Sequence, residues 1–466
     1  MALRFYNSMS RQKEVFEPLE PPNVGLYTCG PTIYNFAHIG NFRAYIFEDL
    51  LRRYLEYRGY KVNHVMNLTD VEDKLIRTVR DTGEPLDAIT GRYARAFFED
   101  IDTLGIRRAH HYPSATDHIN EMVALIKALR DKGHTYEEGG NIYFRLSTFP
   151  EYGKLAHMDI EELRANAGGR VASDEYERED ARDFALWKAW DEEDGDVYWE
   201  TELGKGRPGW HIECSAMAIK YLGPSFDIHC GGVDNMFPHH ENEIAQSQCA
   251  TGKQFVKYWL HCAHLVVEGK KMSKSLGNFF TLRDLLDKGI DPMAIRWVLI
   301  ATHYRQPNNF SFDAVDAAKE SLRRIRDFRR RLDEVRGEGD GLSAECAACE
   351  QAFTEALDDD LNISGALAAV FELVRVLNKK IDDDAAGAAG AKRVLALLDR
   401  LDGVTGLFGA PPEGGDVPHE VLDKVNARQE ARRAKDFARA DALRDELAAD
   451  GWILEDTPDG PRVKKG

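Results

Sequence analysis

Two short motifs carry side chains suited to binding phosphate. The first, HIGN, places His38, Gly40 and Asn41 between an apolar run and the start of a helical pattern. Backbone N–H groups at a helix N-terminus bind anions, and His38 and Asn41 would add two side-chain donors. Gly40 would let a ligand approach the backbone. Taken alone, the motif is more simply explained as a helix start with a capping residue.

The second motif, KMSKS, concentrates positive charge in a turn bounded by glycines. Lys270, Lys271 and Lys274 lie within five residues, between Gly269 and Gly277. A pair of mobile lysines can stabilise the negative charge that develops on a pyrophosphate leaving group. The alternative is an ordinary solvated basic turn.

A third set of residues has the chemistry of metal ligands. Cys29 precedes the HIGN loop, Cys214 lies in GWHIECSAM, and His239 and Glu243 are four residues apart in FPHHENE. Residues four apart on a helix share one face, and two thiolates, an imidazole and a carboxylate can form a zinc site. On the residues alone, other ligands remain open: Cys230, His240, Cys249, Cys262 and His264.

A parallel sheet would bring these residues together. The order strand, helix, strand is indicated twice by apolar spacing, at residues 24–28, 42–58 and 61–67, and again at 226–232, 237–252 and 258–267. Such units imply a parallel sheet, at whose carboxyl edge ligands bind. We predict two halves of one doubly wound sheet, separated by an insertion at about residues 110–200 that contains a hairpin at 135–146 and an acidic run at 173–184.

The second part of the chain is predicted to be helical. It begins with residues 319–336, whose apolar stripe comprises Leu322, Ile325, Leu332 and Val335. Residues 420–466 form a small tail unit with one further helix and a hairpin-like apolar patch. The basic stretches at 319–336 and 424–439 suit phosphate contacts, although solvated helix faces explain them as well. We interpret Cys346 and Cys349 as packing residues in an Ala-rich helix.

Composition limits the class of protein. The 466 residues include 61 basic and 79 acidic side chains, a net charge of −18, which argues against a generally basic nucleic-acid binder. No stretch reaches the about 18 consecutive apolar residues of a membrane-spanning helix, and the first residues do not form a secretory signal. We therefore expect a cytoplasmic protein without a membrane partner, and reduced thiols rather than disulfides among its seven cysteines.

The two phosphate-binding motifs, in this order on a split parallel sheet, resemble those of the class I aminoacyl-tRNA synthetases, whose signatures are HIGH and KMSKS. The second match is complete, and in the first Asn41 replaces the last histidine but can still donate a hydrogen bond to phosphate. The blocks LYTCGPTIYNFAHIGN, NLTDVEDK, GWHIECSAM, GGVDNMFPHHENE and DFARADALRDEL resemble those of the cysteinyl-tRNA synthetases, and the resemblance covers nearly the whole chain.

This resemblance implies ATP-dependent activation of L-cysteine and its transfer to the 3′ end of tRNA(Cys). ATP would act with Mg²⁺, and one Zn²⁺ per chain would bind the substrate thiol. The metal ligands would be Cys29, Cys214, His239 and Glu243. Because serine differs from cysteine only in its hydroxyl, an ordinary pocket discriminates weakly between them, and a bond from zinc to a soft thiolate would supply the selectivity.

The resemblance also assigns roles around the substrate. His38, Asn41, Lys271 and Lys274 would stabilise the charge that develops at the α-phosphate. The residues expected to bind ATP are Gly40, Gly232, Asp234, Met272, Ser273 and Ser275, together with Lys274. Thr69 and Trp210 would line the amino-acid pocket. Asp70 and Asp234 both remain candidates for accepting the α-amine.

We therefore predict an α/β fold: a Rossmann-like doubly wound parallel sheet split by an insertion, then an α-helical tRNA-binding domain and a small C-terminal unit. The predicted ranges are 1–310 for the catalytic domain, with the insertion at 110–200 and the KMSKS-loop region at 265–310, 311–405 for the helical DALR-type bundle, and 406–466 for a linker and anticodon-binding unit. The family is often monomeric, and we expect a monomer.

Two alternative functions remain. One is a cysteine ligase of mycothiol biosynthesis, which has the same fold and an amino-sugar acceptor. The other is a non-enzymatic, synthetase-like factor that binds zinc and RNA. The long helical C-terminal region favours the tRNA enzyme over the first, and the intact KMSKS motif argues against the second.

Overall fold

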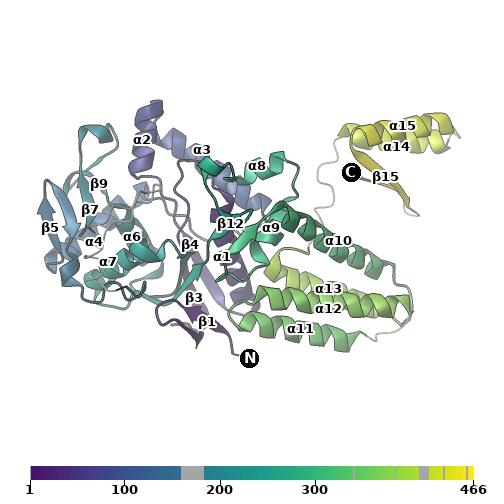
Figure 1. Ribbon diagram of the computed structural model, residues 1–466, viewed down its shortest axis with the longest axis horizontal. Coiled ribbons are helices and arrows are strands. Elements are labelled where there is room, and N and C mark those ends of the chain that lie inside the picture. The colour runs from purple at the N-terminus through teal and green to yellow at the C-terminus, as the bar shows by residue number, and fades with distance from the viewer. Residues whose placement is uncertain are drawn as a thin grey trace. The chain divides into compact units, whose positions relative to one another are not determined.

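The first of two compact units, which ends at Phe408, is built on a four-stranded parallel sheet with the order β11-β10-β3-β4 (Figure 1). The computed structural model describes residues 2–158, 183–338, 342–383, 385–408, 419–433, 436–457 and 460–465. The strands of this sheet are β3 (Asn23–Thr28), β4 (Lys61–Met66), β10 (Phe226–Gly232) and β11 (Val256–Cys262). All their pairings are parallel, so the four carboxyl ends lie at one edge.

Helices cover both faces of this sheet. Side chains alternate between the faces along a strand: Leu26 and Leu260 pack with helix α1, whereas Tyr27 and Trp259 pack with helices α6 and α7. The helices are α1 (Ile39–Tyr57), α6 (Trp210–Leu222) and α7 (Glu241–Thr251). The predicted doubly wound parallel sheet is therefore confirmed.

The insertion between the two halves of the sheet forms a second, antiparallel sheet with the order β5-β6-β7-β9-β8. The predicted hairpin is present, and Gly139 and Gly140 connect its strands with φ angles of 60° and 83°, the positive values that a two-residue hairpin turn needs. The strands are β5 (Thr135–Glu138), β6 (Asn141–Phe144), β7 (Phe184–Ala189), β8 (Trp199–Thr201) and β9 (Gly204–Pro208). Of the predicted acidic run, only Asp183 and Phe184 lie within the described residues.

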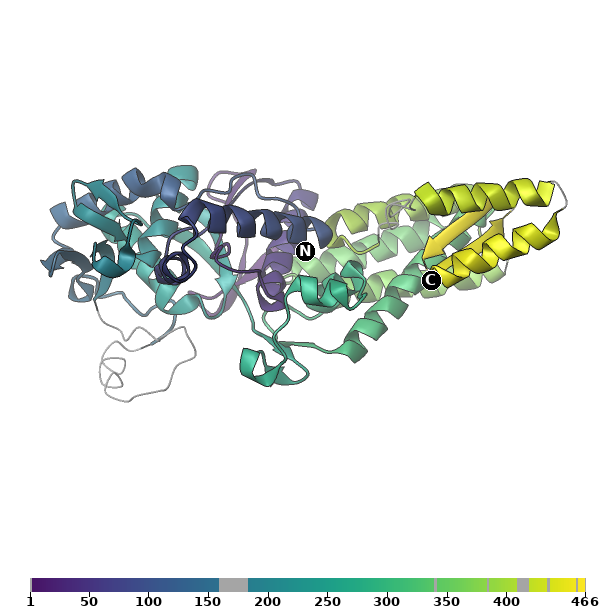
Figure 2. The ribbon, with the colours of Figure 1, turned by 90° about the horizontal axis from the view of Figure 1, so that it is seen from above.

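Other elements connect or flank these sheets. Strands β1 (Arg4–Asn7) and β2 (Gln12–Val15) form a hairpin, and the helices between β4 and β5 are α2 (Asp73–Thr82), α3 (Leu86–Thr103) and α4 (Ile119–Asp131). Seen from above, the antiparallel sheet lies at one end of the first unit and the green helices of its later part lie at the other (Figure 2).

The prediction of a single strand at residues 258–267 is wrong, because the structure divides these residues between two strands that belong to different sheets. β11 ends at Cys262, the Ala263 N–H donates to the Tyr304 carbonyl (2.8 Å), and β12 (Leu265–Val267) starts a small separate sheet. There it pairs with β13 (Lys270–Lys271) and β14 (Asn308–Phe310). The KMSKS segment therefore extends from this small sheet, and α8 (Leu282–Asp287) and α9 (Pro292–Ile300) follow it.

A helical bundle completes the first unit. Its helices are α10 (Phe312–Glu334), α11 (Ser343–Asp358), α12 (Ile363–Asp382) and α13 (Ala388–Thr405). α10 begins earlier than predicted because the Ser311 hydroxyl caps it by accepting from the Ala314 N–H. Leu322, Ile325 and Leu332 of the predicted stripe are buried, and Val335 is the half-buried residue that ends the helix. As predicted, Cys346 and Cys349 are buried packing residues.

The basic side chains of α10 are largely engaged in ion pairs. Arg329 pairs with Asp399 of α13 (2.6 Å), and Arg331 pairs with Asp382 of α12. Further pairs within α10 join Lys319 to Asp316, Arg323 to Glu320 and Arg330 to Asp327. Two of these pairs join α10 to α13 and α12, and the other three lie within α10 itself; that this stretch contacts phosphate stays a prediction.

The second unit contains a helix pair and a hairpin. Its elements are α14 (His419–Arg433), α15 (Phe437–Ala449), β15 (Trp452–Thr457) and β16 (Gly460–Lys465). The predicted hairpin is confirmed. The prediction of a single helix is wrong, because a second helix begins directly after Asp436, whose side chain caps it by accepting from the Arg439 N–H. Lys424 pairs with Asp450 (2.7 Å), and Arg428 is buried. Among the described residues of both units, no helix has the length and apolar character needed to cross a membrane.

Candidate active site and metal centre

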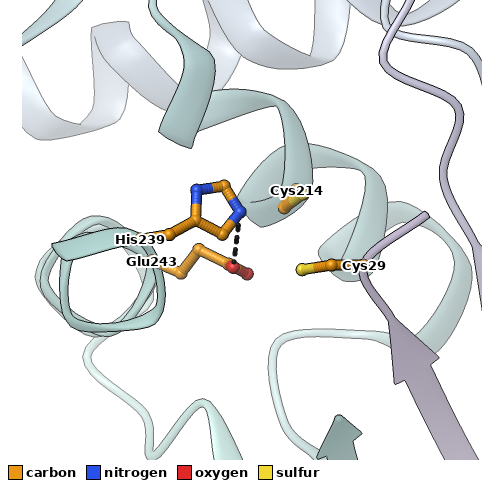
Figure 3. Close-up of side chains that lie close together, drawn as sticks. All are labelled: Cys29, Cys214, His239 and Glu243. Carbon is orange, nitrogen blue, oxygen red and sulfur yellow. Dashed lines mark ion pairs between the residues drawn. The ribbon is translucent and has the colours of Figure 1, made fainter. Parts of the chain in front are cut away.

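Cys29, Cys214, His239 and Glu243 converge beside the carboxyl edge of the central sheet. Their ligand atoms all lie within 4.8 Å of one another, although more than 180 residues separate Cys29 from Cys214 along the chain. Cys29 follows β3 directly, and Cys214 lies in the second turn of α6. Figure 3 shows the four side chains pointing toward a common centre. The sequence thus identified a set of residues that the fold brings together.

The third and fourth side chains come from two consecutive helical segments. His239 lies in a π-helical turn, Met236–His240, that leads into α7, and Glu243 lies in the first turn of α7. Their four-residue spacing places His239 Nε2 3.2 Å from Glu243 Oε1, as predicted from the shared helix face.

Neighbouring side chains hold these two groups in a state suited to a cation. His239 Nδ1 is hydrogen-bonded to His211 Nδ1 (2.8 Å), and His229 Nε2 lies 3.0 Å from Glu243 Oε2. Burial, with the nearby His211 and His229, lowers the pKa of His239 well below its usual value, so the ring is neutral. A neutral ring that uses Nδ1 for its neighbour keeps Nε2 for a metal.

The donor set fits zinc on two observations. Glu243 Oε1 is buried and has no hydrogen-bond partner among the described residues, although it faces His239 Nε2. A cation between the two atoms would satisfy both. Two sulfurs, one imidazole nitrogen and one carboxylate oxygen are also ligands that zinc accepts. The hydrogen bond to Cys214, followed by burial, raises the pKa of the Cys29 thiol well above its usual value, so a bound metal would have to displace a proton.

A second possible ligand set shares two of these residues. Cys29 and Glu243 also cluster with His229 and His240, and His240 Nε2 lies 3.4 Å from Cys29 Sγ. His240 Nδ1 is in turn hydrogen-bonded to His261 (2.8 Å). Of the other ligands left open by the sequence, Cys230, Cys249, Cys262 and His264 belong to neither set.

The HIGN segment begins α1 and forms a reciprocal cap. His38 Nδ1 accepts a hydrogen bond from the Asn41 N–H (3.2 Å), and the Asn41 side-chain oxygen accepts from the His38 N–H (3.1 Å). Burial lowers the pKa of His38 to about 4, although Asp234 opposes this shift. The neutral ring therefore carries its proton on Nε2. His38 Nε2–H and the Asn41 NH₂ group are both left as donors for an anion at this helix start.

The KMSKS loop lies against the HIGN segment. A Cβ atom at Gly40 would lie 2.9 Å from the His38 ring and 3.2 Å from Met272 Cε, so only glycine allows this approach. The Ile39 N–H also donates to the Phe280 carbonyl (3.0 Å), which follows the loop. The fold thus brings together two motifs that lie about 230 residues apart along the chain.

Within the loop, Asn278 makes the bonds that shape it. Its Oδ1 accepts from the Ser273 N–H (2.8 Å), and its Nδ2 donates to the carbonyls of Lys271 (3.1 Å) and Val267 (3.3 Å). The Ser273 and Ser275 hydroxyls are 2.7 Å apart. The Lys274 side chain lies outside the described part of the chain. Sequence analysis missed the role of Asn278, because only the folded loop shows which backbone groups its amide reaches.

Of the two predicted pocket residues, Trp210 directly contacts the metal cluster. The Trp210 ring stacks on that of His239, with centroids 4.4 Å apart, and buried Thr69 accepts from Asn67 Nδ2 (3.1 Å). Gly232 ends β10, and a Cβ atom there would lie 2.2 Å from Asp234 Oδ1, so the Asp234 carboxylate folds over this glycine. The negative charge of Asp234 also acts to raise the pKa of His38 in the HIGN segment, against the effect of burial.

Comparisons with known proteins first identify the class. The family model for the class I (C) tRNA synthetase catalytic domain matches residues 15–320. A methionyl-tRNA synthetase of Mycobacterium tuberculosis, solved with methionyl-adenylate, shares the fold at a TM-score of 0.59 and 16% identity, over 82% of this chain and 90% of that one. A putative arginyl-tRNA synthetase of Campylobacter jejuni has a TM-score of 0.53 at 14% identity, over 83% and 92%. The catalytic part is thus that of a class I tRNA synthetase.

Further matches identify the family within this class. The DALR domain model matches residues 352–409, and the cysteinyl-tRNA ligase anticodon-binding domain model matches 415–462. Cysteine–tRNA ligases of Brachyspira hyodysenteriae and Solibacter usitatus are each 49% identical to this chain. The first alignment covers 99% of both chains, and the second covers both completely. The chain belongs to the cysteine–tRNA ligase family.

Proposed function

We propose that this protein activates L-cysteine with ATP and transfers it to the 3′ end of tRNA(Cys). The observation that carries the proposal is the convergence of Cys29, Cys214, His239 and Glu243 beside the HIGN helix start, in a chain of this family. We propose that they hold one zinc ion, which when bound would take the substrate thiolate and so distinguish cysteine from serine. We also propose that ATP binds together with Mg²⁺ and that the protein is a cytoplasmic monomer.

In the first step, a carboxylate oxygen of cysteine attacks the α-phosphorus of ATP. The bond to the β-phosphate oxygen breaks, and pyrophosphate leaves. We propose that His38, Asn41, Lys271 and Lys274 stabilise the negative charge on the transferring and leaving phosphates. His38 and Asn41 are held by the reciprocal cap, so their donors are preorganised and no side-chain nucleophile is needed.

In the second step, a hydroxyl at the tRNA 3′ end attacks the carbonyl carbon of the adenylate, and AMP leaves. The proposed ATP contacts are those predicted from the sequence: Gly40, Gly232, Asp234, Met272, Ser273, Lys274 and Ser275. Thr69 and Trp210 are proposed to line the amino-acid pocket beside the metal. We also propose the division into a catalytic part (1–310), a helical bundle (311–405) and a C-terminal unit (406–466).

Cysteine-dependent ATP–pyrophosphate exchange tests the first step. The purified protein should exchange with L-cysteine and not with L-serine, and charging of purified tRNA(Cys) should separate it from an amino-sugar ligase. Lys274→Ala should lose exchange while cysteine still binds, whereas the matched control Lys270→Ala should keep it, since Lys270 is a lysine of the same loop region that lies outside the set proposed to contact phosphate. Normal exchange by Lys274→Ala would refute its role, and absence of exchange in the unmodified protein would refute the function.

A further inference from the structure

A buried arginine ties the start of helix α1 to the end of helix α9. Arg43 lies in α1, two residues after Asn41, and it is 2% exposed. Its guanidinium donates to three main-chain carbonyls, those of Leu299, Thr302 (2.9 Å) and His303 (2.9 Å). These bonds hold the carbonyls at the end of α9, which lack partners within the helix, and those of the chain that leaves it.

Arg43 is held by carbonyls and not by a carboxylate. Among the described residues it forms no ion pair, and the ionisable side chain that acts on it is the Cys262 thiol. Burying a cation is costly unless its donors are used, and here the two Nη groups are used to hold the main chain of another segment. A guanidinium with so little exposure cannot reach a ligand, so any role in the reaction must be indirect.

The segment that Arg43 holds belongs to the framework of the KMSKS loop. Asn308 of β14 donates from Nδ2 to the carbonyls of Val298 (2.8 Å) and Leu299 (3.3 Å), so it shares the Leu299 carbonyl with Arg43. β14 pairs with β12, and β12 pairs with β13, which is Lys270–Lys271. A continuous path of hydrogen bonds therefore leads from the HIGN helix to the base of the loop.

The other end of the loop is attached to the HIGN segment directly. The Ile39 N–H donates to the carbonyl of Phe280, which follows the loop (3.0 Å). The loop thus has two attachments to α1, one at its far end through Ile39 and one at its base through Arg43. A single attachment would let the loop turn about it, whereas two attachments fix its orientation.

We propose that Arg43 is a positioning residue for the activation of cysteine: it holds the HIGN helix start and the KMSKS lysines at the spacing at which both act on one chain of phosphates. In this step negative charge develops on the α-phosphate and on the leaving pyrophosphate, so its stabilisation needs both motifs together. A displacement of about 1 Å at such a site can cost about a hundredfold in rate. The inference rests on the proposed function, because it gives Arg43 a part in that reaction.

The proposed zinc site does not depend on this tie. Cys214 and Glu243 belong to α6 and α7, which cover the face of the central sheet opposite to α1. Loss of the Arg43 bonds should therefore slow activation and leave the zinc content and the binding of cysteine in place. The transfer step should also persist, because pyrophosphate has already left when the tRNA hydroxyl attacks.

The test measures the two steps separately in Arg43→Lys. Lysine keeps the charge, but its donors radiate from one nitrogen and cannot span carbonyls that Nη1 and Nη2 bind separately. The kcat of ATP–pyrophosphate exchange should fall about tenfold to a hundredfold, with the KM for cysteine and the zinc content within about threefold. Single-turnover transfer to tRNA(Cys), from cysteinyl-adenylate accumulated in the presence of pyrophosphatase, should also stay within about threefold.

Two further variants keep the test decisive. Arg52→Lys is the matched control, since Arg52 is a buried arginine of the same helix that donates to a different carbonyl, that of Arg108 (2.6 Å), and both rates should be kept. If Arg43→Lys does not fold, Asn308→Ala removes the next bonds of the path. It should show the same pattern of slower exchange and unchanged transfer.

The outcomes separate the two proposals. An unchanged kcat of exchange in the variant that folds, or equal losses in exchange and in transfer, would overturn the positioning role while the proposed function stands. Absence of cysteine-dependent exchange in the unmodified protein would instead overturn the proposed function itself.

Discussion

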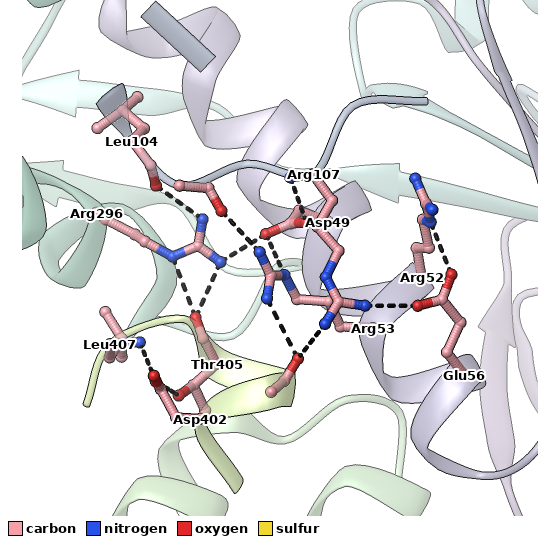
Figure 4. Close-up of polar contacts among 12 residues, drawn as sticks. Asp49, Arg52, Arg53, Glu56, Leu104, Arg107, Arg296, Asp402, Thr405 and Leu407 are labelled. Atoms are coloured by element: carbon pink, nitrogen blue, oxygen red, sulfur yellow. Dashed lines mark hydrogen bonds and ion pairs between the residues drawn. The ribbon is translucent and has the colours of Figure 1, made fainter. Parts of the chain in front are cut away.

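Arg296 of α9 and Asp49 of α1 form an ion pair in which both side chains are fully buried, with Arg296 Nη2 2.6 Å from Asp49 Oδ2. Arg296 also donates to the carbonyls of Leu104 (3.0 Å) and Thr405 (2.9 Å). Burial acts to raise the pKa of Asp49, but Arg296 and Arg53 outweigh it and hold this pKa below its usual value. Figure 4 shows how the pair joins the HIGN helix to α9 and to the end of the bundle helix α13.

Removing one partner of this pair should destabilise the first unit strongly. Asp49→Asn leaves the Arg296 guanidinium buried without its countercharge, which should lower the free energy of unfolding by about 3–5 kcal/mol. Denaturant unfolding measures the loss. The control is Asp359→Asn, which breaks an exposed pair with Lys13 and should cost less than about 1 kcal/mol. Equal losses in the two variants would contradict the importance of burial.

Glu48 should make stability fall as pH rises. Burial raises its pKa to about 8, with the Thr28 hydroxyl opposing the shift, whereas its ordinary value is 4.5. Between these values the folded state keeps a proton that the unfolded state releases, so unfolding becomes easier by up to about 1.4 kcal/mol per pH unit. Glu48→Gln cannot titrate and should remove this slope.

The measurement for Glu48 is the unfolding free energy of both proteins at several pH values. The variant should gain stability over the unmodified protein as pH rises from about 5 to about 8, and the difference should level off above that. Parallel stability curves would show that the carboxyl is ionised in the folded state at neutral pH.

Asn278 should be a positioning residue for the KMSKS loop. Asn278→Ala removes its bonds to Ser273, Lys271 and Val267, so the lysines lose their preorganised position and the kcat of ATP–pyrophosphate exchange should fall about tenfold to a hundredfold. The KM for cysteine should not change. Asn278→Asp keeps the acceptor for the Ser273 N–H, so its kcat should lie between those of Asn278→Ala and the unmodified protein. If Asn278→Ala and the unmodified protein had the same kcat, the loop would not depend on this residue.

Sequence reasoning succeeded where local pattern decides the structure. Apolar runs located the strands that end at Thr28 and Gly232, and residue type with helical spacing located the cluster around His239 and Glu243. It failed for residues 258–267, since an apolar run does not say with which strand it pairs. It also missed the break between α14 and α15, although Asp436 is a recognisable N-cap residue.

The other functional residues that the sequence analysis missed depend on partners that are distant along the chain. His211 is an ordinary helical residue in the sequence, and it gains a role only through its bond to His239. Asn41 shows another kind of omission: we expected it to replace the last histidine of the HIGH signature as a donor to phosphate, and the structure shows that its side chain also completes the cap on His38.

The two possible metal-ligand sets can be separated by zinc content alone. Cys214→Ser should lower the zinc bound after dialysis from about one per chain to well below that, because one of the two thiolate ligands is lost. Cys230→Ser alters another buried cysteine, one that belongs to neither set, and should keep the metal. Full zinc content in Cys214→Ser would favour the set with His229 and His240.

Cutting the chain after Phe408 should separate activation from charging. Leu407 and Phe408 are buried, and their N–H groups donate to Asp402 Oδ1 (2.5 Å each), so this point closes the first unit. The shortened chain should keep cysteine-dependent exchange within about twofold but lose at least about tenfold in kcat/KM for charging tRNA(Cys), because the anticodon-binding unit and its cations are gone. A chain ended at Arg400 is the control, since it cuts α13 before the Thr405 carbonyl that holds Arg296, and it should unfold. Equal losses of exchange and charging after the cut at Phe408 would argue against a tRNA-reading role for the second unit.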